Sequence, residues 1–173
     1  MRNITESLKL NNTISHLNLS TNNIGCNYES IQCLCEALKI NSSISNLNLA
    51  DNHIGDSSIT CLCEMIKINK SLTKLNLRYN CINSNYHLLE ITQALKNNNS
   101  IMELNLFGNS IDESLGSIAI KHFTDLFSIN TSIVFIGIFH SNTQVNPFIE
   151  RNKGYLTKKK SGYISILSIL ARL

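Results

Sequence analysis

Charged residues are scarce in this chain, at 16% of its 173 residues, and the formal net charge is only +3. Nucleic-acid-binding proteins usually carry a clustered basic face, so this balance argues against that class. The longest apolar run, residues 163–173, is too short and too interrupted by serine to span a bilayer. The segment after Met1 lacks the apolar core of a secretory signal peptide. We therefore expect a soluble, cytoplasmic protein without a membrane span.

Sequence motifs of common catalytic, nucleotide and metal sites are also missing. The chain has no GxxxxGK[ST] loop and no HExxH helix, and its five histidines occupy unrelated positions. None of the six cysteines forms a CxxC pair, and no histidine lies at a spacing that would complete a zinc site. We therefore expect a protein that is not an enzyme and has no cofactor.

Two cysteine pairs occupy equivalent positions, Cys33/Cys35 in SIQCLCEALKIN and Cys61/Cys63 in SITCLCEMIKIN. A spacing of two residues places the members on different faces of a helix, so neither pair is an internal disulfide. Small apolar core residues are the preferred interpretation. A disulfide or metal site between neighbouring repeats is the alternative. Free thiols in this number indicate a reducing compartment.

What the chain does contain is one segment in five copies, the last of them degraded. The copies begin at residues 14, 44, 72, 101 and 133, so the period is 28 to 32 residues. They read ISHLNLSTNNIG, ISNLNLADNHIG, LTKLNLRYNCIN, IMELNLFGNSID and IVFIGIFHSNTQ. The pattern LxxLxLxxNxI is typical of a leucine-rich repeat, and a period of this size indicates a solenoid of stacked units.

Each unit changes from a strand pattern to a helix pattern. Leucines alternate with polar residues in the LxL part, which predicts a half-buried strand. Apolar residues at i, i+3, i+4 and i+7 then predict a helix with one inward stripe. The four stripes are Ile31/Leu34/Cys35/Leu38, Ile59/Leu62/Cys63/Ile66, Leu88/Ile91/Thr92/Leu95 and Ile120/Phe123/Thr124/Phe127.

Two sets of asparagines recur with the repeat. The first follows each strand and is predicted to form a structural ladder, because an amide can both donate to and accept from buried backbone groups. Its members are Asn22, Asn52, Asn80 and Asn109. The second falls where each helix should end, and we expect a left-handed C-terminal conformation there. Its members are Asn41, Asn69, Asn98 and Asn130.

The predicted fold is α/β, a right-handed leucine-rich-repeat solenoid over residues 1–153 with about four and a half repeats. Parallel strands should line the concave side and helices the convex side, because strands pack more closely than helices do. The chain starts in mid-repeat: either residues 4–13 form a helix that closes this end, or the chain is a piece of a longer array. The basic, then apolar tail 154–173 is expected to form a capping helix; an amphipathic membrane segment is the alternative.

The period, the LNLxxN strand and the xALKxNxSI junction resemble the ribonuclease-inhibitor-like class of leucine-rich-repeat proteins. The resemblance covers about residues 4–153. It implies a cytosolic protein that binds other proteins through the concave face and the adjoining loops. Function in this class lies at variable positions, so the resemblance does not name the partner.

Candidate partner-binding residues are the variable positions predicted on the concave side of the central repeats. They combine an arginine and aromatic residues, which are enriched at binding hot spots, with charges of both signs. They are Asp51, Lys74, Arg78, Tyr79, Glu103 and Phe107. In an alternative interpretation, Phe107, Phe135 and Phe139 are covered by the C-terminal tail.

The predicted function is a non-catalytic, monomeric module that binds a protein or peptide through the concave face. One alternative is a regulator or adaptor of an enzyme, similar to a GTPase activator or a ubiquitin-ligase adaptor. Such a regulator would need an exposed arginine on a rim loop or a recruiting domain, whereas Arg78 is predicted on a strand. The other alternative is a dispersed repeat copy without a partner of its own.

Overall fold

The computed structural model describes residues 2–109 and 116–137. Helices and strands alternate along these residues, and one short 3-10 helix follows the first strand. In chain order the elements are α1 (Arg2–Leu10), β1 (His16–Asn18), η1 (Ile24–Cys26), α2 (Tyr28–Ile40), β2 (Asn46–Asn48), α3 (Asp56–Ile68), β3 (Lys74–Asn76), α4 (Asn85–Lys96), β4 (Glu103–Asn105), α5 (Gly116–Ile129) and β5 (Phe135–Gly137).

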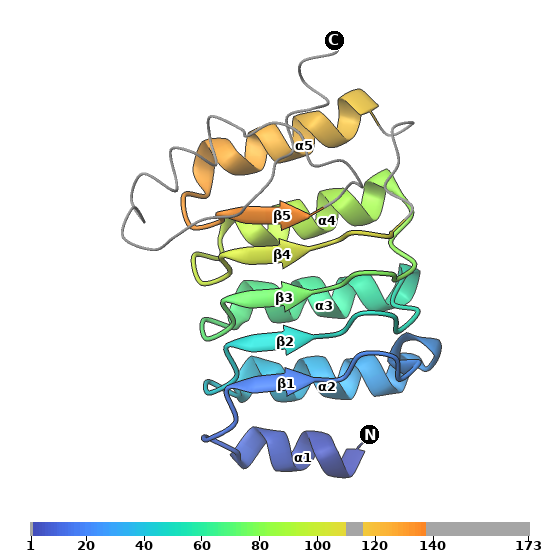
Figure 1. Ribbon diagram of the computed structural model, residues 1–173, viewed down its shortest axis with the longest axis vertical. Helices are drawn as coiled ribbons and strands as arrows, with labels where there is room; N and C mark the ends of the chain where they lie inside the picture. Colours follow the sequence, from blue (N-terminus) through green and yellow to red (C-terminus); the bar gives the residue numbers. More distant parts are fainter. Residues whose placement is uncertain (1, 110–115, 138–173) are drawn as a thin grey trace.

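The five strands form one parallel sheet whose spatial order is the order of the sequence. Equivalent repeat positions face each other across every pair, as in Leu47↔Leu75 and Leu75↔Leu104. The helices lie side by side on one face of the sheet, each packed on its neighbour from α1 to α5 (Figure 1). The prediction of an α/β fold with parallel strands is confirmed. We call the other face, on which none of the described helices lies, the open face.

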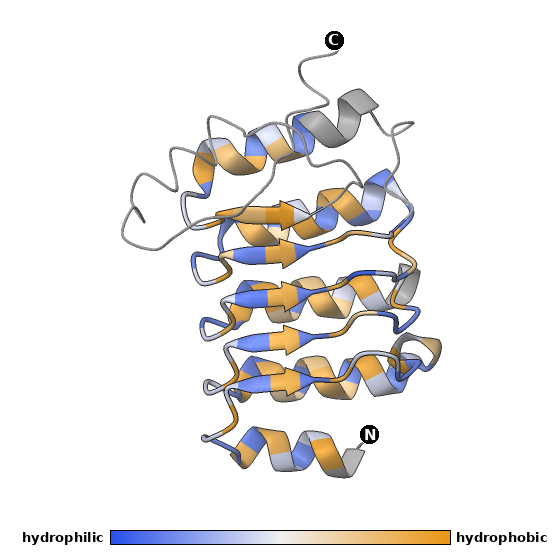
Figure 2. Cartoon of the chain, in the orientation of Figure 1, coloured by the Kyte–Doolittle hydropathy of each residue, from blue (hydrophilic) through white to orange (hydrophobic). Residues whose placement is uncertain are grey.

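The core lies between the sheet and the helices. The central residue of each strand points into it, and from β2 onward that residue is fully buried, as Leu47 and Leu75 illustrate. Figure 2 shows apolar residues at the middle of the strands and, alternating with polar ones, along the helices. The predicted helix stripes are buried in α2, α3 and α4. In α5 the prediction for Thr124 was wrong, because Thr124 is exposed.

The asparagines after the strands connect neighbouring units. The side-chain Oδ1 of Asn80 accepts hydrogen bonds from the backbone N–H groups of Asn52 and Ile54, at 3.1 and 2.9 Å. Its Nδ2 donates to the carbonyl oxygens of Leu49 and Leu77, each at 3.0 Å. Asn52 and Asn109 make the equivalent bonds one unit earlier and one unit later. Each of these side chains thus satisfies backbone groups of two successive units.

The asparagines at the helix ends form a second ladder, and the reason predicted for them was wrong. Asn41 and Asn69 have extended backbone, with φ of −65° in both, and not the left-handed conformation. Their amides are buried and bridge units: Nδ2 of Asn69 donates to the carbonyl oxygens of Leu38 and Asn41, at 2.7 and 3.2 Å. Asparagine is needed here because its side chain pairs buried backbone groups, and its tolerance of positive φ has no part in it.

All six cysteines are free thiols. Burial raises the pKa of the Cys63 thiol to about 12. Interaction with the Cys61 thiol on α3 raises the pKa of Cys35 on α2, and the same interaction lowers the pKa of Cys61. Free thiols rule out the disulfide between neighbouring repeats, and no group of residues that could hold a metal ion is found within 2–109 and 116–137.

Thiol reactivity should follow these pKa shifts, because the thiolate is the reactive form. At pH 8 we expect iodoacetamide to modify Cys61 faster than Cys35 or Cys63 in the native protein. Mass spectrometry of timed digests measures the rates, and in denaturant the three rates should become equal. Modification of Cys63 as fast as that of Cys61 in the native protein would contradict this arrangement.

Several predictions lie outside the described residues. They include the boundary at residue 153, the capping helix in 154–173 and the last copy beyond Gly137, with Phe139 in it. Among residues 2–109 and 116–137, no helix has the length and apolar character needed to span a membrane.

Candidate functional site

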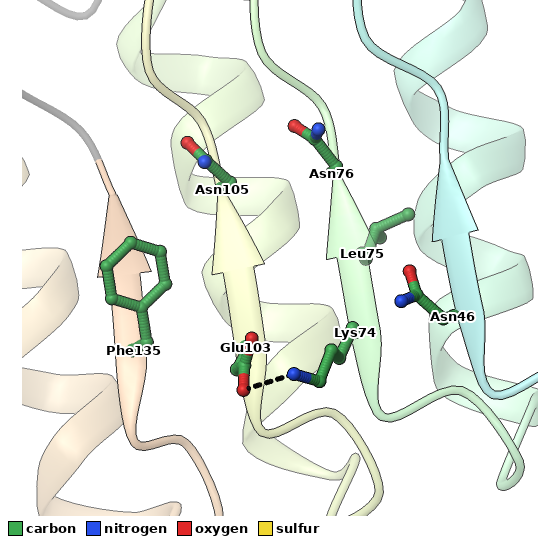
Figure 3. A pocket seen from close by; sticks show the side chains of 7 residues that line it. All are labelled: Asn46, Lys74, Leu75, Asn76, Glu103, Asn105 and Phe135. Carbon is green, nitrogen blue, oxygen red and sulfur yellow. Dashed lines mark ion pairs between the residues drawn. The ribbon is translucent and has the colours of Figure 1, made fainter. Parts of the chain in front are cut away.

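The open face of the sheet carries the polar and aromatic positions of the repeat. Residues on either side of the buried central residue point to this face, since side chains alternate along a strand. In β3 these are Lys74 and Asn76, and in β4 they are Glu103 and Asn105. The face changes along the sheet: β1 and β2 offer one histidine and three asparagines, whereas β3, β4 and β5 offer charged and aromatic side chains (Figure 3).

A shallow hollow of about 190 Å³ lies on the open face over β2 to β5. Its lining residues are Asn46, Lys74, Leu75, Asn76, Glu103, Asn105 and Phe135 (Figure 3). The Lys74 ammonium and the Glu103 carboxylate form an ion pair across it, at 2.8 Å. The two charges neutralise each other, so the hollow presents amide groups and the ring of Phe135 to a ligand.

An arginine and two aromatic rings gather just beyond the strand ends. The rings of Tyr79 and Phe107 meet edge to face, with centroids 5.6 Å apart and planes at 81°. The Arg78 guanidinium carbon lies 5.1 Å from the Tyr79 ring centroid and 4.8 Å from that of Phe107. Both distances are within the range of cation–π attraction. We call these three residues the aromatic cluster.

The backbone at Tyr79 adopts a left-handed conformation, with φ of 50°. The same repeat position is left-handed in Thr21 and Asp51, and Gly108 fills it in the fourth unit, with φ of 73°. A bulky aromatic residue is unusual in this region. A Cβ at Gly108 would clash with the Tyr79 ring, so the ring rests against the backbone of the next unit. The fold thus holds Tyr79 in place with 51% of the residue exposed.

The six predicted partner-binding residues form two groups and one separate residue. Arg78, Tyr79 and Phe107 make the aromatic cluster, and Lys74 pairs with Glu103. Asp51 is exposed, and its backbone N–H donates to the carbonyl oxygen of Arg78 at 2.8 Å.

Arg78 was predicted on a strand, but it lies two residues past the end of β3 (Lys74–Asn76). The interstrand hydrogen bonds continue there, since the Tyr79 N–H donates to the Phe107 carbonyl at 2.9 Å. Sequence reasoning also did not include the hollow residues Phe135 and Asn46 in the site. Both occupy the same repeat position as Lys74, and this shared position could have indicated that they belong to the site.

The central asparagine column of the open face has a defined orientation. The Oδ1 atoms of Asn48, Asn76 and Asn105 each accept the backbone N–H two residues later, at 3.1 Å. Their Nδ2 groups have no hydrogen-bond partner within 2–109 and 116–137. The column therefore presents amide donors to the open face.

Comparisons with known proteins give structural matches. No family model matches the chain, and no curated protein sequence matches it. A solved structure titled "Leiomodin-1 Actin-Binding Site 2 (ABS2)" matches with a TM-score of 0.75 and 25% identity, covering 89% of this chain and 90% of that one. The tropomodulin C-terminal domain of Caenorhabditis elegans matches with a TM-score of 0.74 and 23% identity, covering 88% of this chain and 95% of that one.

These matches correct the family predicted from the sequence. The chain is similar in structure to the leiomodin-1 and tropomodulin domains, so the assignment to the ribonuclease-inhibitor-like class was wrong. The motifs that carried this assignment are strand leucines and ladder asparagines. The leucines pack in the core and the asparagines bond to the backbone. Both roles belong to the fold, which explains why these motifs did not identify the family.

Proposed function

We propose that the chain is a non-catalytic protein-binding module, a right-handed leucine-rich-repeat solenoid that holds its partner on the open face. The observation that carries the proposal is the aromatic cluster. Its arginine and two aromatic residues are of the types that dominate binding hot spots, and Tyr79 is held exposed by the backbone. Because the Tyr79 side chain is exposed, it contributes little to packing of the core.

The adjoining hollow adds polar contacts to the same surface. The hollow and the aromatic cluster share two neighbouring units. The central part of the hollow lies on β3 and β4, and the cluster follows directly after these two strands. Five strands spaced about 4.8 Å apart give a face roughly 20–25 Å long. A face of this length fits one small domain or one segment of a larger protein, near the lower limit of a stable interface.

Actin is the first partner to test. The reason is the similarity in structure to the leiomodin-1 domain, whose title names an actin-binding site and whose length the match covers almost completely. The test is co-sedimentation of the purified chain with actin filaments, together with anisotropy titration of labelled monomeric actin. Saturable binding of either form supports the proposal.

Replacement of the two rings of the aromatic cluster, exposed Tyr79 and half-buried Phe107, should abolish this binding. We expect Tyr79→Ala with Phe107→Ala to reduce affinity for actin at least a hundredfold while the protein still unfolds cooperatively. The matched control is Tyr28→Ala with Tyr86→Ala, which removes two exposed tyrosines from α2 and α4, and it should bind like the wild type. If the Tyr79/Phe107 variant still binds actin and the Tyr28/Tyr86 variant does not, the partner binds on the helix side.

A further inference from the structure

We infer that Arg78 binds a carboxylate of the protein partner, so that the partner presents an acidic side chain beside apolar ones to the open face. This inference rests on the proposed function, because it assigns the chemistry of what the open face recognises. It concerns Arg78, the two rings that hold it and the amide column next to it.

Arg78 has no acidic partner in the described part of the chain. No ion pair joins its guanidinium to a carboxylate there, and its Nε is buried without a hydrogen-bond partner. Lys74, in contrast, is already paired with Glu103. Among the described residues, the Arg78 guanidinium is compensated by the two aromatic rings and by no carboxylate.

The rings fix the guanidinium in a geometry suited to a carboxylate. Contact with both Tyr79 and Phe107 restricts the rotamers of the long Arg78 side chain, so little further entropy is lost when a ligand binds. A guanidinium matches a carboxylate through two parallel N–H···O bonds, and such charge-assisted pairs are among the stronger hydrogen bonds. The rings also provide apolar surface for the neighbours of the acidic residue.

The amide column next to Arg78 also favours a ligand rich in acceptors. Because Oδ1 of Asn76 accepts the N–H of Arg78, and Oδ1 of Asn105 accepts that of Phe107, both Nδ2 groups must be the donors on the open face. These amides lie on neighbouring strands, with Asn76 paired to Asn105, and Figure 3 shows them side by side. Arginine and amide donors together select carboxylate and carbonyl oxygens.

Asp51, on the preceding unit, carries a charge that opposes this ligand. Its backbone N–H bonds to the Arg78 carbonyl, so it lies next to Arg78 in the neighbouring unit, and it is exposed. A partner carboxylate at Arg78 would be repelled by the Asp51 carboxylate. Removing the Asp51 charge should therefore tighten binding of an acidic ligand, whereas removing the Arg78 charge should weaken it.

The test uses two blocked octapeptides, one of alternating glutamate and leucine and one with glutamine in place of glutamate. Anisotropy titration gives affinities, and the NMR signal of the Arg78 Nε–H group, assigned with Arg78→Lys, reports contact even for millimolar binding. We expect the wild type to prefer the glutamate peptide at least tenfold and the Arg78 signal to shift with it. Arg78→Gln should lose this preference, and Asp51→Asn should increase it two- to fivefold.

The control for net charge is Lys121→Gln on α5, which removes the same charge from the helix side and should leave affinity unchanged within twofold. Equal binding of both peptides, binding of neither, or an unchanged preference in folded Arg78→Gln would overturn the inference. Actin distinguishes the two proposals. If actin fails to bind while the glutamate peptide binds through Arg78, the choice of actin is wrong and the inference stands. If actin binding is lost with Tyr79→Ala and Phe107→Ala but kept in Arg78→Gln, binding at the open face is supported and the role of Arg78 is contradicted.

Discussion

Asn80→Ala should lower the free energy of unfolding by about 2–6 kcal/mol. The reason is that the substitution leaves the N–H groups of Asn52 and Ile54 without their acceptor, and each buried unpaired group costs about 1–3 kcal/mol. Asn22→Ala is the matched control. Asn22 is exposed and donates only within its own unit, so its loss should cost roughly 0.5–1 kcal/mol.

Urea denaturation followed by circular dichroism measures both values, with the slope m compared to check that unfolding remains cooperative. Equal losses for the two variants would show that the ladder does not connect units through Asn80.

Asn98→Ala should destabilise the protein by a similar amount, about 2–6 kcal/mol, through the second ladder. Oδ1 of Asn98 accepts the N–H groups of Ser100 and Ile101, at 3.0 and 2.8 Å. Its Nδ2 donates to the carbonyl oxygens of Ile66 and Asn69, at 2.7 and 3.0 Å, and the residue is fully buried. No other side chain can replace both functions in the same space.

The neighbouring residue provides the control for this prediction. Asn99 is exposed and carries the same side chain one position later, so Asn99→Ala should change stability by less than about 0.5 kcal/mol. The same urea titration compares the two variants. A small effect of Asn98→Ala would mean that water satisfies the backbone groups at the helix ends, and the second ladder would then be unimportant for stability.

The sequence predicted the repeating strands and helices well, because each has its own apolar period. Leu47 and Leu75 alternate with polar neighbours, and Leu34 and Leu38 follow a helical spacing. The prediction failed for Thr124, where the threonine at i+4 copies a buried position of the preceding helix. Leu126 is buried in α5 as Met65 and Ala94 are at the same position of α3 and α4, so the helix presents the same face to the core and Thr124 departs from the copied position.

The candidate site was predictable only in part. The residue types of Arg78, Tyr79 and Phe107 and their repeat positions indicated a common surface, and the structure brings them into contact. The left-handed backbone at Tyr79 could not be predicted, because the position holds threonine, aspartate and glycine in the other units. The ion pair of Lys74 and Glu103 needed the register of β3 against β4.

The two ladders also determine where the chain tolerates changes in length. Eleven residues separate Asn41 from Asn52, Asn69 from Asn80, and Asn98 from Asn109. From each strand-end asparagine to the next helix-end asparagine, the distance varies from 17 residues (Asn52 to Asn69) to 21 (Asn109 to Asn130). Two side chains anchored to the neighbouring unit fix the length of the strand segment between them. The differences in length between units therefore fall in the helical half, while the strand segment that carries the open face keeps a constant length.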